Sequence, residues 1–273
     1  MKTFLMWVLA MSSGAALAAE VSMAVGDIKD SRTNGKFFNE LEIELSLKGD
    51  VLEKVDRYRL RLDAAVDDTG RDLLQKERSD NDFEDAHGFG SRQPDQISVD
   101  LKFRNPARKA EKVKEIRGVV ELYAPSLDPA AVVPFPQVRA KKGQALETPA
   151  TRAAGIKLMV AVKDGAEAPK PKPAAEGANP LQAMVESFGG LFGGDEFAVL
   201  LKLEDPQGRV AGYQVVDGQG KVIKSRSRSV MNRTMITLGF DDKLPPDVGL
   251  VLQLKTERSL IRLPVALADI PLP

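Results

Sequence analysis

The stretch LEIELSLK, residues 41–48, has an apolar side chain at every second position. The apolar residues of this stretch are Leu41, Ile43, Leu45 and Leu47, and the polar ones are Glu42, Glu44, Ser46 and Lys48. A period of two puts successive side chains on opposite faces of a β-strand, so that one face lies on a core and the other in water. Strands with one solvated face are typical of antiparallel sheets, and the stretch therefore predicts an all-β fold.

The same alternation recurs along most of the chain. Further runs cover residues 58–62, 97–103, 156–162, 197–203, 236–240, 250–254 and 261–267. Residues 67–70, 205–208 and 217–220 combine Asp and Gly in the way that tight turns require, and we interpret them as hairpin turns. The chain is thus predicted to consist of antiparallel strands.

Two eight-residue stretches, VDDTGRDL (66–73) and VDGQGKVI (216–223), begin with Val-Asp and place Gly four positions after the Val. We interpret them as a weak internal repeat of two related domains. Strands are expected to start near 21, 41, 56, 71, 96, 117 and 132, then near 156, 197, 209, 221, 234, 249 and 260. The prediction is two immunoglobulin-like antiparallel β-sandwich domains, residues 19–140 and 141–273, with a seam near 140–154 and a short helix inserted in the second.

Residues 1–18 have the features of a signal peptide. A short basic start is followed by an apolar run from Phe4 to Met11 and by small residues that end at Ala18, after which we expect cleavage. The apolar run is shorter than a membrane-spanning helix, so no transmembrane anchor is expected in the mature chain. The predicted location is the periplasm or the medium.

Composition limits the chemistry. The 273 residues contain 39 Lys and Arg against 39 Asp and Glu, which argues against a polybasic nucleic-acid binder. There is no Cys, His87 is the single histidine, and Trp7 is the single tryptophan and belongs to the predicted signal peptide. A metal site with several histidines and a Cys-His nucleophile are therefore excluded, and neither a cofactor nor an enzyme is predicted.

Residues 79–95 form a long polar connection in the first predicted domain. The loop carries Asp80, Asp82, Glu84, Asp85 and His87. Its carboxylates are the hard oxygen ligands that Ca²⁺ prefers, but their spacing departs from the EF-hand pattern. His87 has the chemistry of a general base, and an extracytoplasmic hydrolase or metal-dependent enzyme centred on this loop is the alternative to a solvated loop.

The second insertion, residues 165–195, starts with a Pro/Ala/Lys-rich segment. Leu181, Met184, Val185 and Phe188 then follow at the spacing of one helical face, and Phe192 lies beyond them. We expect a short amphipathic helix on a tether. Its apolar side has two interpretations, packing across the second sandwich or docking on a partner.

Two sets of cations alternate with other residues and are candidates for anion binding. The first set is Arg57, Arg59 and Arg61, and the second is Lys224, Arg226 and Arg228. Three cations on one strand face can bind an anionic polymer or a membrane surface. The alternative is a solvent face whose charges are offset by neighbouring strands and which discourages edge-to-edge association of sheets.

The stretches AAVDDTGRDL, SVDLKFRNPARKAEKVKEIRGVVELYAP, VVDGQGKVI and RLPVALADIPLP give the chain a resemblance to a family over most of its mature length. It resembles exported bacterial proteins of uncharacterised function with immunoglobulin-like β-sandwich domains. The resemblance implies that fold and export, and it implies no catalytic residue or substrate. The expected function is a non-enzymatic extracytoplasmic binding or protein-interaction module, with a protein or an envelope polymer as its partner.

Overall fold

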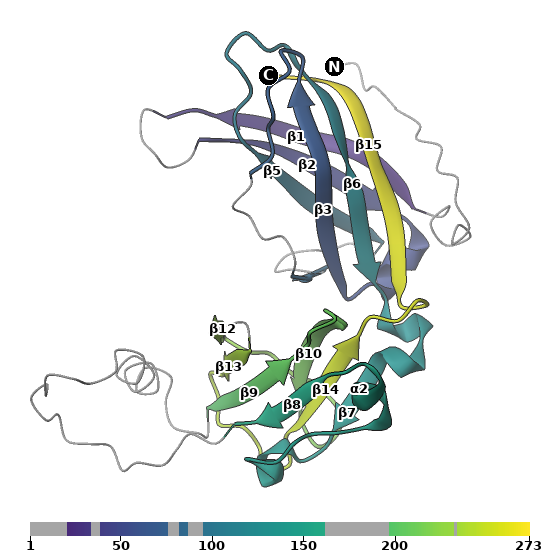
Figure 1. Cartoon of the computed structure of the whole chain (residues 1–273), viewed down its shortest axis with the longest axis vertical. Helices are drawn as coiled ribbons and strands as arrows, with labels where there is room; N and C mark the ends of the chain where they lie inside the picture. The colour runs from purple at the N-terminus through teal and green to yellow at the C-terminus, as the bar shows by residue number, and fades with distance from the viewer. Residues whose placement is uncertain (1–20, 34–38, 76–81, 87–94, 162–196, 232–233) are drawn as a thin grey trace, which may run out of the picture. The chain divides into compact units, whose positions relative to one another are not determined.

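The computed structural model describes residues 21–33, 39–75, 82–86, 95–161, 197–231 and 234–273 (Figure 1). Most of these residues form β-strands, and every strand pairing between them is antiparallel. The expectation of an all-β antiparallel protein is therefore confirmed. The predicted signal peptide (1–18) and the whole of the 165–195 insertion, with its predicted helix, lie outside the described residues. No helix in the described part of the chain is both long and apolar enough to cross a membrane.

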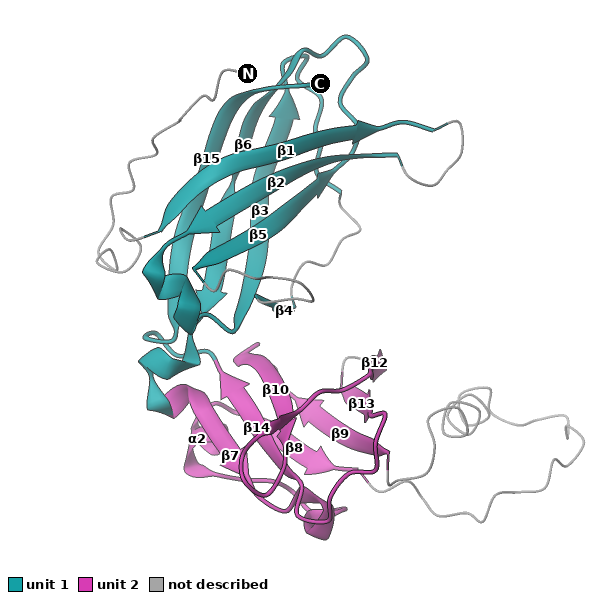
Figure 2. Cartoon of the chain, turned by 180° about the vertical axis from the view of Figure 1, so that it is seen from behind, with its two compact units in different colours: residues 1–129, 255–273 teal, residues 130–254 magenta. Residues whose placement is uncertain are grey.

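The chain divides into two compact units, Met1–Pro129 with Lys255–Pro273 as unit 1 and Ala130–Leu254 as unit 2 (Figure 2). The elements of unit 1 are β1 (Ser22–Ser31), β2 (Glu40–Lys48), η1 (Asp50–Lys54), β3 (Arg57–Asp67), β4 (Glu84–Asp85), β5 (Gln96–Phe103), β6 (Lys112–Tyr123), η2 (Pro125–Leu127) and β15 (Leu260–Pro271). A short turn of helix, η3 (Pro129–Ala131), spans the first boundary. Unit 2 is thus inserted in the chain between β6 and β15.

Unit 1 contains two sheets around one core. Their strand orders are β1-β2-β5 and β15-β6-β3-β4, and Figure 1 shows them as two layers. The alternation in β2 places Leu41, Ile43, Leu45 and Leu47 in the core with no exposed surface. Val120 and Leu122 of β6 belong to the same core cluster. Burial of the apolar side chains of both sheets, worth about 25 cal/mol per Å², stabilises this arrangement.

Unit 2 also has two sheets and one core. Its elements are β7 (Val132–Phe135), η4 (Val138–Lys141), α2 (Pro149–Ala153), β8 (Lys157–Val160), β9 (Ala198–Glu204), β10 (Val210–Val216), β11 (Val222–Ile223), β12 (Ser227–Met231), β13 (Met235–Gly239) and β14 (Gly249–Leu254). The strand orders are β11-β10-β14-β7 and β12-β13-β9-β8. The core cluster draws on both sheets, with Leu201 and Ile236 from one and Leu250 and Leu252 from the other.

The predicted division into residues 19–140 and 141–273 differs from these units at two strands. β7 was assigned to the first domain, but it pairs with β14 in unit 2. β15 was assigned to the second domain, but it pairs with β6 along eleven residue positions in unit 1. The predicted seam is not a linker either, because it includes α2, whose N-terminus is capped by Thr148 through a capping box. A strand pattern predicts a strand but not its partner, which is why these assignments were wrong.

The two turns of the proposed internal repeat have the same geometry. In each, the Asp amide bonds to the carbonyl oxygen four residues later, and the glycine amide bonds to the Asp carbonyl oxygen: Asp67 with Arg71 and Gly70, Asp217 with Lys221 and Gly220. Both glycines have positive φ, 86° and 84°, which favours glycine. Each turn follows the strand that lies second from one edge of a four-stranded sheet. This strand is β3 in unit 1 and β10 in unit 2.

The strands that follow these turns are not the same. Residues 217–220 form the predicted hairpin between β10 and β11. After residues 67–70 only an isolated bridge, Val66 to Asp72, replaces the strand expected near residue 71. Residues 205–208 connect β9 to β10 in the other sheet of unit 2, so the hairpin predicted there is wrong.

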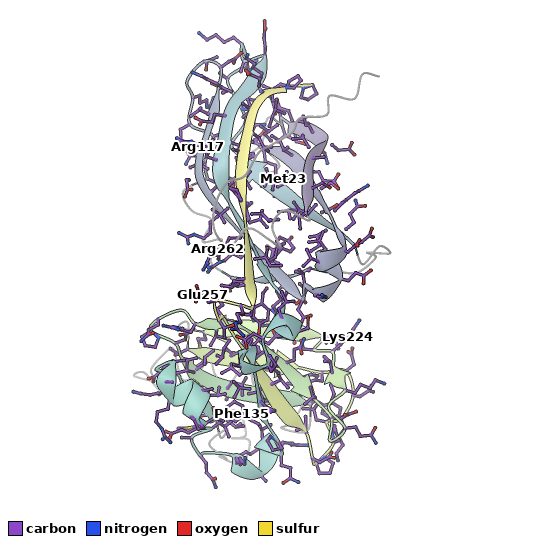
Figure 3. All side chains as sticks on the ribbon, turned by 90° about the vertical axis from the view of Figure 1, so that its right-hand side faces the viewer. Met23, Arg117, Phe135, Lys224, Glu257 and Arg262 are labelled. Carbon is purple, nitrogen blue, oxygen red and sulfur yellow. The ribbon has the colours of Figure 1, made fainter. Side chains whose placement is uncertain are left out.

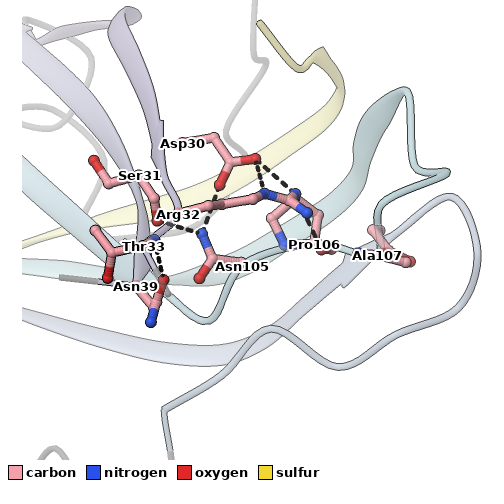
Figure 4. A network of polar contacts seen from close by, with 9 residues as sticks. Asp30, Ser31, Arg32, Thr33, Asn39, Asn105, Pro106 and Ala107 are labelled. Atoms are coloured by element: carbon pink, nitrogen blue, oxygen red, sulfur yellow. Dashed lines mark hydrogen bonds and ion pairs between the residues drawn. The ribbon is translucent and has the colours of Figure 1, made fainter. Parts of the chain in front are cut away.

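A polar network fixes the end of β1 to the connection between β5 and β6 (Figure 4). The Asp30 carboxylate accepts hydrogen bonds from Arg32 Nε at 2.8 Å and from Asn105 Nδ2 at 2.6 Å. Arg32 also donates to the Pro106 carbonyl oxygen, and Asn105 donates to that of Ser31. These contacts hold together segments that are more than 70 residues apart in the chain.

Candidate functional site

The acidic loop predicted at 79–95 is described only at residues 82–86 and 95, so that Asp80 and His87 lie outside the described residues. Glu84 and Asp85 form β4 and pair with Tyr58 and Arg57 of β3. Asp85 forms an ion pair with Arg57 at 3.2 Å, and Glu84 accepts a hydrogen bond from the Tyr58 hydroxyl at 2.9 Å. These two carboxylates therefore face β3. Within the described part of the chain, no three Asp, Glu or His side chains gather as a metal site.

The predicted arginine row of β3 lies on the outer face of its sheet. Arg57, Arg59 and Arg61 alternate with Tyr58, Leu60 and Leu62, which pack against the core. The side chains of Arg57 and Arg59 are only 15% and 13% exposed, because each is held in an ion pair. Arg61 is exposed and has no ion-pair partner among the residues that the structure describes. The row is therefore not a uniform stripe of solvated cations.

A buried carboxylate, Glu121, organises the middle of this face. Glu121 lies opposite Arg59 of β3 on one side and Arg262 of β15 on the other. One of its oxygens accepts a hydrogen bond from Arg59 Nε at 2.8 Å and pairs with the terminal nitrogen of the same guanidinium. Its other oxygen is 3.3 Å from Arg262 Nε. One carboxylate thus orients two guanidiniums, and its side chain is 6% exposed.

Phe83 covers this cluster from the segment next to β4. Its ring lies 4.8 Å from the Arg59 guanidinium and 5.7 Å from the Lys255 ammonium, both within the range of cation–π attraction. The ring also meets that of Tyr123 edge to face, with 6.2 Å between centroids. Burial, and then the charge of Asp56, raises the pKa of Tyr123. An aromatic cover explains how Glu121 and Tyr123 are buried on the outer face of a sheet.

Two carboxylates of unit 1 have lowered pKa values. Burial alone raises the pKa of Glu121, but the hydrogen bonds and charge of Arg59, and then of Arg262, outweigh it. Burial also raises the pKa of Asp67, but hydrogen bonds from the Ala107 amide, the Thr69 hydroxyl and the Arg71 amide outweigh it. Both carboxylates therefore remain charged in the folded protein at a pH at which they are protonated in the unfolded chain.

We expect acid to destabilise unit 1 through these two groups. A carboxyl group whose pKa is lowered by folding stabilises the protein above its unfolded pKa, and this contribution is lost as the pH falls through the folded pKa. The free energy of unfolding should therefore decrease as the pH falls below about 4, where unfolded carboxyl groups take up protons. Urea titrations at several values between neutral pH and pH 3 measure this, and a free energy that stays constant over the range would contradict it.

Two arginines that the sequence did not single out complete the face. Arg117 of β6 and Arg262 of β15 point outward with side chains 61% and 59% exposed, and Figure 3 shows them on the same side of β15. Between them lies the row of Arg61, Val119 and Pro264, which are direct neighbours across three strands. Each of these arginines belongs to a different strand, and no period along the sequence relates them. Only strand pairing brings them together.

The second predicted set of cations does not share a strand face. β12 begins at Ser227, so that Lys224 and Arg226 precede it and only Arg228 lies within it. Arg226 forms an exposed ion pair with Asp241 at 3.4 Å. Arg228 donates to the Tyr213 hydroxyl at 2.5 Å and lies over its ring. The predicted row is wrong as a geometric arrangement because the chain bends before the strand starts.

The predicted partner-binding residues Leu181, Met184, Val185, Phe188 and Phe192 lie outside the described residues. Comparisons of the chain with protein-family models, with curated proteins and with solved structures gave no match. The candidate site is therefore defined by its own geometry. It is the arginine face, formed by Arg61, Arg117 and Arg262 around Val119 and Pro264, with Arg59 and Glu121 beneath.

Proposed function

We propose that this chain is a non-enzymatic, extracytoplasmic binding module whose arginine face binds an anionic polymer of the cell envelope. The observation that carries the proposal is the arrangement around Glu121, in which one buried carboxylate serves Arg59 and Arg262 while Arg61 lies on the next row with no ion-pair partner among the described residues. Arg117 is paired with Glu115 at 2.8 Å, which leaves Arg61 as the arginine of the face without an ion pair among the described residues. Guanidinium groups recognise carboxylate and phosphate in a planar, two-pronged geometry.

We also propose that both units have an immunoglobulin-like fold. In the immunoglobulin fold, strands A, B, E and D form one sheet and C, F and G the other. The orders β1-β2-β5 and β15-β6-β3-β4 of unit 1 correspond to A-B-E and G-F-C-C′ when the strands are lettered in chain order. In unit 2, β12-β13-β9-β8 corresponds to D-E-B-A and β11-β10-β14 to C′-C-F. There β7, which precedes the other strands of unit 2, takes the place of G.

This lettering also supports the interpretation of two related domains. β3 and β10 are both C strands, and each is followed by the same Asp-Gly turn at an offset of 150 residues. Unit 2 would then be a circularly permuted relative of unit 1, since its G-like strand β7 comes first in the chain. It would be inserted between the F and G strands of unit 1. Such sandwiches commonly present sheet faces and end loops as contact surfaces, and the arginine face is a sheet face of this kind.

Export is supported by the sequence of residues 1–18 and by the location that a polymer-binding module requires. The basic start, the apolar run and the small residues before position 19 are the three parts of a signal peptide. The absence of cysteine means that folding in the envelope needs no disulfide. An anionic polymer of the envelope would meet the arginine face there.

Charge reversal of the arginine face should weaken binding to an anionic polymer. We expect Arg61→Glu with Arg117→Glu to reduce affinity for polygalacturonate at least about tenfold, which is ~1.4 kcal/mol. The reason is the replacement of two attractive charges on the face by two repulsive ones. Binding of the mature chain should also weaken with added salt, because the groups are exposed. Titration by fluorescence anisotropy of labelled polymer measures both effects.

The matched control reverses two exposed lysines on the other sheet of unit 1, Lys29→Glu with Lys48→Glu. It changes the net charge by the same amount and should leave affinity within about twofold. Equal losses in the two double variants would mean that net charge alone matters and would refute the assignment of the face. Equal binding of the wild-type chain to neutral dextran would refute the anionic class of ligand.

A further inference from the structure

The outer face of the β12-β13-β9-β8 sheet in unit 2 carries a group of apolar side chains beside the polar residues Lys202, Thr237 and Ser229. Leu158, Val160, Val199, Leu201, Ile236 and Leu238 point into the core, so that their neighbours along the strands point outward. The outward residues include Met159 of β8, Leu200 of β9, Met235 of β13 and Met231 of β12. We call these four residues the methionine face. The first three are partly exposed, and Met231 is 36% exposed.

The outward-facing charged residues of β8 and β9 are Lys157, Lys202 and Glu204, and Lys202 is the direct neighbour of both Met159 and Met235. Lys157 and Lys202 both form ion pairs with Glu204, at 3.5 and 3.4 Å. Beyond Lys202 along β9, the outward positions hold Leu200 and Ala198. The corresponding sheet of unit 1 is different, since the outward positions of β2 include Glu42 and Glu44. An antiparallel sheet normally turns polar side chains to water, so a group of apolar side chains on an outer face indicates a surface that is covered.

The chain itself supplies a segment that starts and ends at this sheet. The Ala161 amide donates to the Leu200 carbonyl oxygen at 2.9 Å, so β8 and β9 are still paired where the residues between them begin and end. The described residues that flank 162–196, Ala161 and Phe197, therefore both lie at this sheet. Phe188 and Phe197 are nine positions apart, and this length of chain can span up to about 30 Å. A four-stranded sheet is only about 15 Å wide, so every position on the face is within reach.

We propose that the apolar stripe Leu181, Met184, Val185 and Phe188 docks on the methionine face of its own chain. The stripe has the complementary character, since its spacing places four apolar residues on one side of the predicted helix. Methionine side chains adapt to irregular apolar surfaces, which suits a face with three of them. Attachment at both ends gives the stripe an effective concentration in the millimolar range, which favours it over an external protein.

Disulfide trapping tests this proposal, and the chain offers a clean background because it has no cysteine. Thr237 lies opposite Leu200, on the outer face of the sheet. We expect Val185→Cys with Thr237→Cys to form an intramolecular disulfide under mild oxidation at least about tenfold faster than Ala183→Cys with Thr237→Cys. Ala183 is on the opposite side of the predicted helix but has the same tether. Gel mobility and mass spectrometry of the full mature chain report the products.

Equal rates for the two pairs would overturn the proposal, because they would mean that the tether moves without a preferred side. Disulfide-linked dimers in place of the intramolecular product would also overturn it, since they would identify a second copy as the occupant. A readout without cysteine is oxidation of methionines by hydrogen peroxide, which requires access to the sulfur. Phe188→Asp should speed oxidation of Met159 and Met235 severalfold and leave Met23 of unit 1 unchanged. Unchanged rates at all three methionines would refute docking.

Discussion

Replacing Glu121 with glutamine is expected to lower the free energy of unfolding of unit 1 by about 3–5 kcal/mol, the range for a broken buried ion pair. The Glu121 side chain is 6% exposed and is the carboxylate shared by Arg59 and Arg262. Glutamine keeps the size of the side chain but has no negative charge, and its amide group donates where an acceptor is needed. Arg59, which is 13% exposed beneath Phe83, would then lose the carboxylate that accepts its hydrogen bond and pairs with its charge.

Hydrogen exchange with mass spectrometry localises this loss. Amides of β2 in unit 1 should exchange faster in the Glu121→Gln variant, while amides of β9 in unit 2 should not change, provided the units open separately. The difference in stability between wild type and variant should also shrink as the pH falls from about 4, where the unfolded chain takes up a proton at Glu121, through the lowered pKa of folded Glu121. A difference that is constant from neutral pH to pH 3 would contradict the assigned charge.

A double variant separates the charge from the packing. Arg59→Met with Glu121→Leu removes both charges and keeps apolar volume under Phe83. It should recover most of the stability lost in Glu121→Gln, because replacement of a buried ion pair by apolar residues is often neutral or stabilising. If the double variant were as unstable as the single one, packing and not the loss of the Glu121 charge would be the cause.

Replacing Asp67 with asparagine should lower the free energy of unfolding of unit 1 by about 2–4 kcal/mol. Asp67 is fully buried, and one carboxylate oxygen accepts hydrogen bonds from the Thr69 amide, the Thr69 hydroxyl and the Arg71 amide. The other oxygen accepts from the Ala107 amide at 2.8 Å. Asparagine can accept on one side only, so its amino group would face the Ala107 amide, donor against donor, without access to water.

Asp217→Asn is the matched control, because the two turns have the same backbone hydrogen bonds. One oxygen of Asp217 accepts from the amides of Gln219 and Lys221, and no described residue donates to the other. Asparagine can keep both bonds, so the loss should be within about 0.5 kcal/mol, as for most surface substitutions. Chemical denaturation followed by circular dichroism compares the variants. Equal losses would mean that the turn, and not the bond to Ala107, is what Asp67 stabilises.

Local patterns in the sequence were reliable where one strand or one turn was enough to determine the structure. β2 starts and ends within one residue of its alternating stretch, and its four apolar residues are all in the core. The turn at 217–220 forms the predicted hairpin, since Asp and Gly supply the acceptor and the positive φ within the turn itself. The turn at 205–208 has the same residue types but leads to another sheet. Turn chemistry fixes a reversal of the chain and leaves the partner of the next strand open.

The candidate site was only partly predictable for the same reason. The spacing of Arg57, Arg59 and Arg61 correctly places them on one outward face of β3. It does not reveal that Asp85 neutralises Arg57 and that Glu121 neutralises Arg59, because these partners are 28 and 62 residues away in the sequence. Arg117 and Arg262 come from strands separated by the whole of unit 2. No pattern within a single strand contains that information.

The sequence by itself determined the strand class, the period that assigns each side chain to core or surface, and the turns that need Asp and Gly, because these depend on residues within a few positions of one another. Tertiary structure alone decided that β15 completes unit 1, that β7 completes unit 2, and that Glu121 becomes a buried centre for two arginines. These outcomes depend on which strand edges pair across 62 residues or more. That choice is made by the burial of whole sheet faces, which no local pattern encodes.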